Sequence, residues 1–140
     1  MSLVLDASVA LGWVFQRSSE RERGLADRVL AALAEHEEPL VPWIWHLEVI
    51  NALLVAERRG VIDQERGSRF LQRLRELPIH TEATPPIGLD PQLHGLARSA
   101  GLSAYDACYL ELALRSGSRL ATFDGALAAA AVNAGVELFR

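Results

Sequence analysis

The sequence of 140 residues contains no lysine and a single cysteine. All 14 of its basic residues are arginine, and the formal net charge is −4 at pH 7. An acidic chain offers no broad basic surface of the kind that holds nucleic acid, so a nucleic-acid partner has to be held by local contacts. The lone Cys108 excludes an internal disulfide and is typical of a reducing compartment, which predicts a cytoplasmic location.

Long uncharged apolar runs are also missing. Each long apolar stretch is interrupted by Asp, Glu or Asn before it reaches the roughly 18 residues that a membrane span needs, so we expect no membrane partner. No basic residue precedes Arg17, and the charged start of a secretory signal is therefore absent. Half of the residues are apolar, which is typical of a globular protein, and the length predicts one domain over 1–140.

Short apolar runs alternate with longer amphipathic ones along the chain. Strands are expected at 3–5, 39–42, 119–123 and 136–139, with a further short strand within 78–88. Helices are expected at 8–15, 25–36, 43–56, 64–77, 92–101, 103–117 and 126–135. This alternation predicts an α/β fold with a mostly parallel central sheet covered by helices on both faces.

Several residues fit the ends of these helices. Asp63 and Ser103 are expected N-caps, and Asp90 and Pro91 are interpreted as the N-cap and first residue of their helix. Glycines close three helices, at positions 60, 117 and 135.

Four carboxylates lie directly against apolar neighbours instead of within charged stretches. They are Asp6 in LVLDAS, Glu48 in WHLEVIN, Asp106 in SAYDACYL and Asp124 in ATFDGAL. Burial of an ionised carboxylate without a partner costs several kcal/mol or forces it to take up a proton. A shared cation removes that cost for all four. Asp6 and Asp124 also end strands, which is where the sites of parallel sheets lie.

Helix capping is an alternative explanation for three of these acids. Asp6, Asp106 and Asp124 all stand where helix caps belong. Glu48 lies well inside its helix, and the apolar residues Ile44 and Val55 on its face argue against exposure. We therefore expect Glu48 to face a polar cleft that holds a metal ion.

The types of candidate ligand favour a hard cation. Oxygen ligands are typical of Mg²⁺ or Mn²⁺, whereas zinc prefers histidine and cysteine. The four histidines, at positions 36, 46, 80 and 94, show no zinc-ligand spacing. Acidic clusters that hold one or two such cations typically carry out phosphodiester chemistry.

The ordered motifs resemble the PIN-domain nucleases and, more narrowly, the VapC-type toxins of bacterial toxin–antitoxin pairs. The resemblance rests on LVLDASV, EVINAL after a VP strand, the closing ERRG, LSAYDACYLELA and LATFD, and it extends from Asp6 to the C-terminus. It implies an α/β/α sandwich and an Mg²⁺- or Mn²⁺-dependent endoribonuclease. It also implies an RNA substrate, a homodimer and inhibition by a cognate antitoxin.

The resemblance also implies roles for particular residues. The catalytic and metal-binding residues are then Asp6, Glu48, Asp106 and Asp124, with Asp6 and Asp106 as principal ligands. Glu48 binds directly or through water, and Asp124 completes the cluster or helps to hold a second ion. Supporting polar residues of the family correspond to Ser8, Asn51 and Thr122. Each of these also fits an ordinary structural role as a helix cap, a helix-face amide or a strand threonine.

Other functions are weighed against this reading. Phosphoacceptor receiver domains and haloacid-dehalogenase-like phosphatases both use a pocket lysine, which this chain lacks. The phosphatases also need an aspartate where Ser8 stands. A catalytically silent PIN-fold module that binds a protein partner stays open. Cys108 and Tyr109 are interpreted as core residues, and spare apolar positions as a surface for an antitoxin helix or a second copy.

Overall fold

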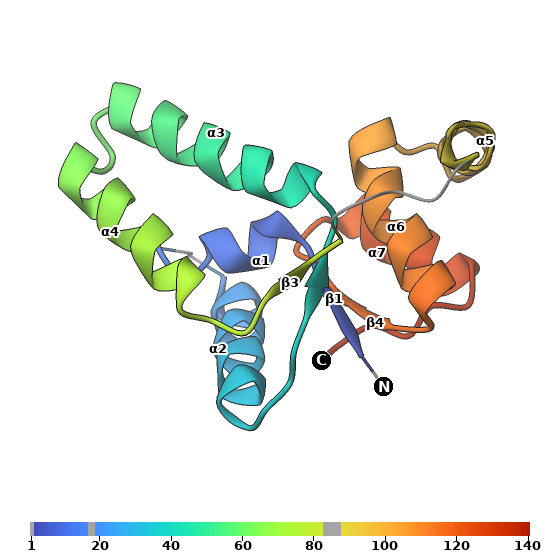
Figure 1. Cartoon of the computed structure of the whole chain (residues 1–140), viewed down its shortest axis with the longest axis horizontal. Helices are drawn as coiled ribbons and strands as arrows, with labels where there is room; N and C mark the ends of the chain where they lie inside the picture. Colours follow the sequence, from blue (N-terminus) through green and yellow to red (C-terminus); the bar gives the residue numbers. More distant parts are fainter. Residues whose placement is uncertain (1, 17–18, 83–87) are drawn as a thin grey trace.

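The computed structural model describes residues 2–16, 19–82 and 88–140. Strands alternate with helices along these ranges, as Figure 1 shows. The elements in chain order are β1 (Leu3–Leu5), α1 (Ala7–Leu11), α2 (Glu20–Ala34), β2 (Leu40–Val41), α3 (Ile44–Arg58), α4 (Gln64–Arg75), β3 (His80–Thr81), α5 (Leu89–Ala100), α6 (Ala104–Ser116), β4 (Arg119–Ala121) and α7 (Gly125–Asn133).

The four strands in these ranges form one sheet in the order β3-β2-β1-β4, and every pairing is parallel. Val4 pairs with Leu40 on one side and Leu120 on the other, so β1 is a central strand. Figure 1 shows α1 to α4 on one side of the strands and α5 to α7 on the other. The expected three-layer α/β/α sandwich is confirmed.

The core is centred on β1, whose residues Leu3, Val4 and Leu5 are completely buried. A continuous apolar run is typical of a parallel strand that is covered on both faces. α6 packs against β1, and its Tyr109 is among the largest fully buried side chains. Because both faces of β1 are packed, the residue that follows it, Asp6, has a fixed place at the end of the sheet.

Most of the predicted helix ends are confirmed. Asp63 accepts the Arg66 N–H at 2.7 Å, and Ser103 accepts the Asp106 N–H at 3.1 Å. The three closing glycines have left-handed φ angles of 73°, 65° and 87° at positions 60, 117 and 135. Glycine adopts this conformation without steric cost, which explains its use at these ends.

The starts of two helices differ from the predictions. α2 begins at Glu20 and not at Leu25, because Ser19 caps it by accepting the Glu22 N–H at 3.3 Å. The apolar pattern could not indicate this first turn, because the turn is charged. Its acidic side chains favour the helix N-terminus. α5 begins at Leu89, so the prediction of Asp90 as its N-cap was wrong.

The physical reason lies in the first turn of α5. Gly88 is the N-cap, with a φ of 83°, and Asp90 and Pro91 are already helical. Proline is tolerated there because the first N–H groups of a helix have no intrahelical partner. Asp90 favours the helix N-terminus by its charge instead of capping it.

Several elements are shorter than expected, most clearly α1 and the last predicted strand. α1 covers Ala7–Leu11, whereas a helix was predicted at 8–15. The predicted last strand, 136–139, is reduced to a single parallel bridge between Leu120 and Leu138. The Leu120 N–H donates to the Glu137 carbonyl at 3.0 Å, and the Phe139 N–H donates to the Leu120 carbonyl at 2.9 Å. These two hydrogen bonds join the segment to β4.

α3 is not buried all round, although most of its side chains are apolar. Trp45, Val49, Leu53 and Ala56 face the core. A second apolar row, which starts at the N-cap residue and continues along the helix, is exposed: Trp43 (62%), Leu47 (53%), Ile50 (41%) and Leu54 (39%). Periodicity could not separate the two rows, because both are apolar.

No helix in the described ranges is both long enough and apolar enough to cross a membrane.

Candidate active site

Two of the four predicted acids follow neighbouring strands. Asp6 comes directly after β1, and Asp124 follows β4. The Asp6 N–H donates to the Ala121 carbonyl at 3.0 Å, which extends the pairing of these strands beyond the end of β1. Because β1 and β4 are parallel neighbours, their carboxyl ends meet at one edge of the sheet. The fold therefore brings together acids from opposite ends of the chain.

Two hydroxyl groups hold the Asp6 carboxylate. Ser8 donates to Asp6 Oδ2 at 2.8 Å, and Thr122 donates to the same oxygen at 2.6 Å. Each hydroxyl in turn accepts a backbone N–H, Ser8 from Phe123 and Thr122 from Asp124, both at 3.0 Å. Both donors reach Oδ2, so neither occupies Oδ1. Ser8 and Thr122 thus contact the acid that they were predicted to support.

Burial dominates the electrostatics of Asp6, which is only 5% exposed. It raises the pKa of the carboxyl above its ordinary value, and the negative charge of Asp124 raises the pKa further. The hydrogen bonds from Thr122 and Ser8 act in the opposite direction but do not cancel the rise. Asp6 is therefore a carboxylate that the fold buries at a cost.

Replacement of Thr122 by Val should test this hydrogen bond. The variant keeps the shape of the strand residue but removes a donor to a buried carboxylate, which typically costs about 1–3 kcal/mol of stability. We also expect the pKa of Asp6 to rise further, because Thr122 lowers it. Denaturant unfolding and carboxyl ¹³C titration measure the two effects. Thr81→Val is the control, since the Thr81 hydroxyl pairs with His46 at 2.6 Å and should leave the pKa of Asp6 unchanged.

Glu48 and Asp106 belong to the same electrostatic group. Burial raises the pKa of Glu48, as do the charges of Asp6 and Asp106, while a hydrogen bond from Tyr109 lowers it. Burial also raises the pKa of Asp106, and the charges of Asp124 and Asp6 add to the rise against the hydrogen bond with Ser103. Glu48 is half-buried in α3, and Asp106 lies partly exposed in the first turn of α6. The four predicted acids therefore form one cluster of mutually repelling charges.

Capping explains only one of these acids. Asp124 caps α7, because its Oδ1 accepts the Leu127 N–H at 3.0 Å. Asp6 occupies the N-cap position of α1, where its Oδ2 accepts the Ser8 hydroxyl and no regular side-chain capping bond is formed. α6 is capped by Ser103, and Asp106 in its first turn favours the helix N-terminus by its charge instead of capping it. Neither effect explains Glu48, and the buried Asp6 needs another explanation as well.

No arginine or histidine among the described residues balances the charge of the cluster. Within the described ranges, none of the four acids forms an ion pair with arginine or histidine. The buried Glu111 is a useful contrast, because Arg115 pairs with it at 2.6 Å and also with Glu82 at 2.6 Å. Among the described residues, arginine therefore neutralises the buried structural carboxylate of Glu111, but the cluster at the sheet edge has no such partner.

Comparison with known proteins identifies the fold. Residues 3–133 match the family model described as the PIN domain. The chain belongs to the PIN-domain family. Ribonuclease VapC3 of Pyrobaculum aerophilum is 33% identical to this PIN domain over 134 residues, which cover 91% of this chain and 93% of the relative. The resemblance in the sequence motifs is thus confirmed.

Two solved structures have the same arrangement as this PIN domain. PAE2754 from Pyrobaculum aerophilum matches with a TM-score of 0.70 and 25% identity, over 93% of this chain and 86% of that chain. FitAcB from Neisseria gonorrhoeae matches with a TM-score of 0.64 and 17% identity, over 99% and 96% of the two chains. At the latter identity the likeness concerns the fold alone.

Sequence analysis missed one residue at the cluster of this PIN domain. Tyr109, interpreted as a core residue, is indeed fully buried, but its hydroxyl donates to Glu48 Oε1 at 2.6 Å. Its position three residues after Asp106 in α6 was a usable signal, because residues at this spacing share a helix face. Asn51 is different. It is exposed on α3, and no residue in the described ranges is seen to hydrogen-bond its side chain, so its supporting role stays a prediction.

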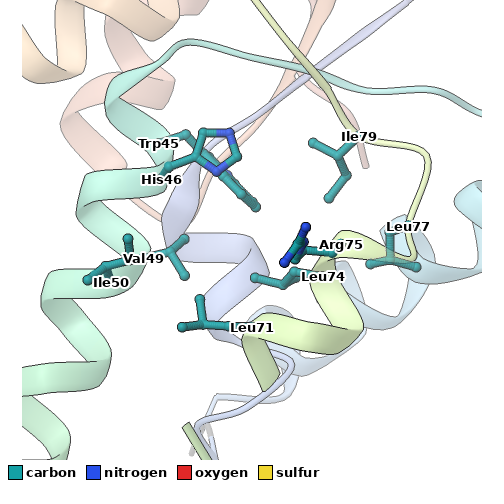
Figure 2. Close-up of a pocket in the computed structure, with 9 residues that line it drawn as sticks. All are labelled: Trp45, His46, Val49, Ile50, Leu71, Leu74, Arg75, Leu77 and Ile79. Atoms are coloured by element: carbon teal, nitrogen blue, oxygen red, sulfur yellow. The ribbon is translucent and has the colours of Figure 1, made fainter. Parts of the chain in front are cut away.

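A separate apolar pocket of about 370 Å³ lies between α3 and α4. In Figure 2, Val49 of α3 and Leu71 and Leu74 of α4 face one another across it. None of the four acids is among its lining residues: Trp45, His46, Val49, Ile50, Leu71, Leu74, Arg75, Leu77 and Ile79. The pocket is thus chemically distinct from the acidic cluster, and its apolar lining suits a protein side chain better than a phosphate.

Proposed function

We propose that this PIN domain is a metal-dependent endoribonuclease that acts as the toxin of a toxin–antitoxin pair and hydrolyses RNA phosphodiester bonds. The observation that carries the proposal is the uncompensated cluster of Asp6, Glu48, Asp106 and Asp124 at the carboxyl edge of the sheet. The 33% identity to a protein named as a ribonuclease supports the reaction and the substrate.

The donor set suits a divalent cation. All four candidate ligands are carboxylates, and such oxygens favour Mg²⁺ or Mn²⁺. In the described ranges no three acidic, histidine or cysteine side chains are already grouped to hold an ion. We therefore propose that Asp106, which is partly exposed, turns toward a bound cation, while the buried Asp6 stays fixed.

Each residue then has a defined task. A cation held there would supply charge neutralisation for the phosphate and activation of the attacking water. Asp6 and Asp106 are the proposed principal ligands, Glu48 binds directly or through water, and Asp124 completes the cluster or helps to hold a second ion. Ser8 and Thr122 orient Asp6 through its Oδ2. Asn51, on the same face of α3 as Glu48, is proposed as a further supporting residue.

The proposal includes protein partners and a location. We propose a homodimer, a cognate antitoxin, and action in the cytoplasm on RNA. The exposed row of Trp43, Leu47, Ile50 and Leu54 supports a protein partner, since its spacing of four, three and four residues is typical of a helix–helix contact. The same row favours the second candidate function, a catalytically silent module that only binds a protein.

Replacement of Asp106 by Asn separates the two functions. For the nuclease we expect a loss of RNA cleavage of roughly 100-fold or more, since even an outer-shell partner of a metal is typically worth 10- to 100-fold. The fold should survive, because Ser103 still caps α6. The assay uses a random-sequence RNA pool with Mg²⁺, Mn²⁺ or EDTA, together with a thermal melt of each variant.

Asp90→Asn is the matched control, because Asp90 is an exposed acid in the first turn of α5. It should cleave like the wild type. Equal, metal-independent cleavage by wild type and Asp106→Asn would contradict the proposed nuclease activity. The catalytically silent binding module would then be the better proposal. Loss of the cooperative melt in Asp106→Asn would instead assign Asp106 a structural role.

A further inference from the structure

We infer that Tyr109 is a positioning residue that holds Glu48 in the orientation needed to bind the cation. The inference rests on the proposed function, because it gives Tyr109 a task only if Glu48 is a metal ligand. Its basis is the 2.6 Å hydrogen bond from the Tyr109 hydroxyl to Glu48 Oε1, which links α6 to α3 across the acidic cluster.

The tyrosine is a rigid donor. Its side chain is completely buried, so the ring cannot change rotamer without a cavity opening in the core. A tyrosine hydroxyl carries its proton at neutral pH, and here it donates that proton in the hydrogen bond to Glu48 Oε1. It can only donate to the carboxylate, and it cannot add a negative charge to the cluster.

The glutamate needs such an anchor. Glu48 is half-buried in a helix whose neighbouring side chains are apolar, and it has no ion pair in the described ranges. A free glutamate loses roughly 1.5–2 kcal/mol of rotamer entropy when it is fixed. A short hydrogen bond to a charged acceptor at Oε1 fixes the side chain before the cation arrives and leaves Oε2 for the ion or a bound water.

The position of the hydroxyl supports the same role. Tyr109 lies one helical turn after Asp106, so α6 supplies one proposed ligand and the anchor of another. Asp6 is close enough for its charge to act on the phenol, and the backbone N–H of Ala7 forms a hydrogen bond that opposes this effect. The hydroxyl thus lies where α6, α3 and the end of β1 meet.

Binding of Mn²⁺ alone tests the inference without any RNA. Free Mn²⁺ is measured by electron paramagnetic resonance in titrations of wild type, Tyr109→Phe, Glu48→Gln and the double variant. We expect Tyr109→Phe to weaken binding roughly 10-fold, as is typical when a partner of a metal ligand is lost. In the Glu48→Gln background the same change should have almost no further effect, because the two residues act as one unit.

Tyr105→Phe is the matched control, since Tyr105 is on the same helix and 63% exposed, and it should bind Mn²⁺ like the wild type. Equal affinity of Tyr109→Phe and wild type, or equal effects of Tyr109→Phe in both backgrounds, would overturn the inference and leave the proposed function intact. No Mn²⁺ binding by the wild type would overturn both.

A second measurement avoids the risk that Tyr109→Phe does not fold. The chain has only two tyrosines, so labelling with ¹³Cζ-tyrosine gives two signals. Addition of Mg²⁺ should shift the Tyr109 signal in the wild type, and this shift should be reduced at least by half in Glu48→Gln. A Tyr109 signal that responds to Mg²⁺ equally in both proteins would mean that the hydroxyl does not act through Glu48.

Discussion

Asp6→Asn should abolish RNA cleavage and at the same time raise the melting temperature of the metal-free protein. Cleavage falls by roughly 100-fold or more because the proposed principal ligand loses its charge. Stability rises because the buried Asp6 carboxylate is desolvated and repelled by Asp124 in the folded state. The Asn side-chain oxygen still accepts the hydrogen bonds of Ser8 and Thr122. We expect a gain on the order of 1 kcal/mol, or roughly 3–4 °C.

The opposite signs of the two effects make the prediction specific. Metal-free calorimetry and the RNA assay are run on the same preparations, with Asp27→Asn as the control. Asp27 is exposed on α2, away from the cluster, and its replacement should change neither quantity. A lower melting temperature for Asp6→Asn would show that the carboxylate stabilises the fold, which removes the physical reason for a cation at this position.

The sheet edge and its acids could be predicted from the sequence because their signals are local. The apolar run at 3–5 ends at Asp6, and parallel strands deliver their carboxyl ends to one edge whatever the length of the connection. Glu48 was found by the contrast between its charge and its apolar helix. Neither inference required knowledge of which residues touch.

The connections within the site could not be predicted in the same way. Thr122 and Ser8 are 114 positions apart and donate to the same oxygen of Asp6, a fact that depends on the register of β1 and β4. The Tyr109 hydroxyl meets Glu48 across a helix–helix contact that no periodicity describes. An aromatic residue in an apolar helix gives the same pattern whether its polar end is satisfied by water or by a catalytic side chain.

The two faces of α3 illustrate a further limit. Trp45 and Val49 face the core, whereas Leu47 and Leu54 are exposed, although all four are large hydrophobic residues. A helix with two apolar rows could bury either row by rotating about its axis, so the sequence pattern does not determine which row faces the core. The choice is made by the neighbouring elements, here α1 and α4, against which α3 packs, and Tyr109 of α6, to which Glu48 hydrogen-bonds.

The second large effect concerns pH and Mg²⁺ together. Without metal, the stability of the wild type should fall as the pH rises from about 4, the ordinary carboxyl range, through the raised pKa values of Asp6, Glu48 and Asp106. In this window the folded protein binds more protons than the unfolded chain, so the free energy of unfolding decreases with pH. A cation competes with these protons, and its stabilising effect should therefore increase with pH.

Thermal melts between pH 5 and pH 8, with and without 5 mM Mg²⁺, measure this linkage. At pH 8 and a concentration about 100-fold above Kd, Mg²⁺ should add about 2.7 kcal/mol, which corresponds to roughly 8 °C, and the shift should be smaller at pH 5 than at pH 8. The other ionisable groups contribute their own slopes, so the decisive quantity is the difference from a variant in which Asp6, Glu48 and Asp106 are all amides. That variant should show no Mg²⁺ shift at any pH. An equal shift in both proteins would place the ion elsewhere, because the variant with three amides has lost the repulsion that a cation at the cluster would relieve.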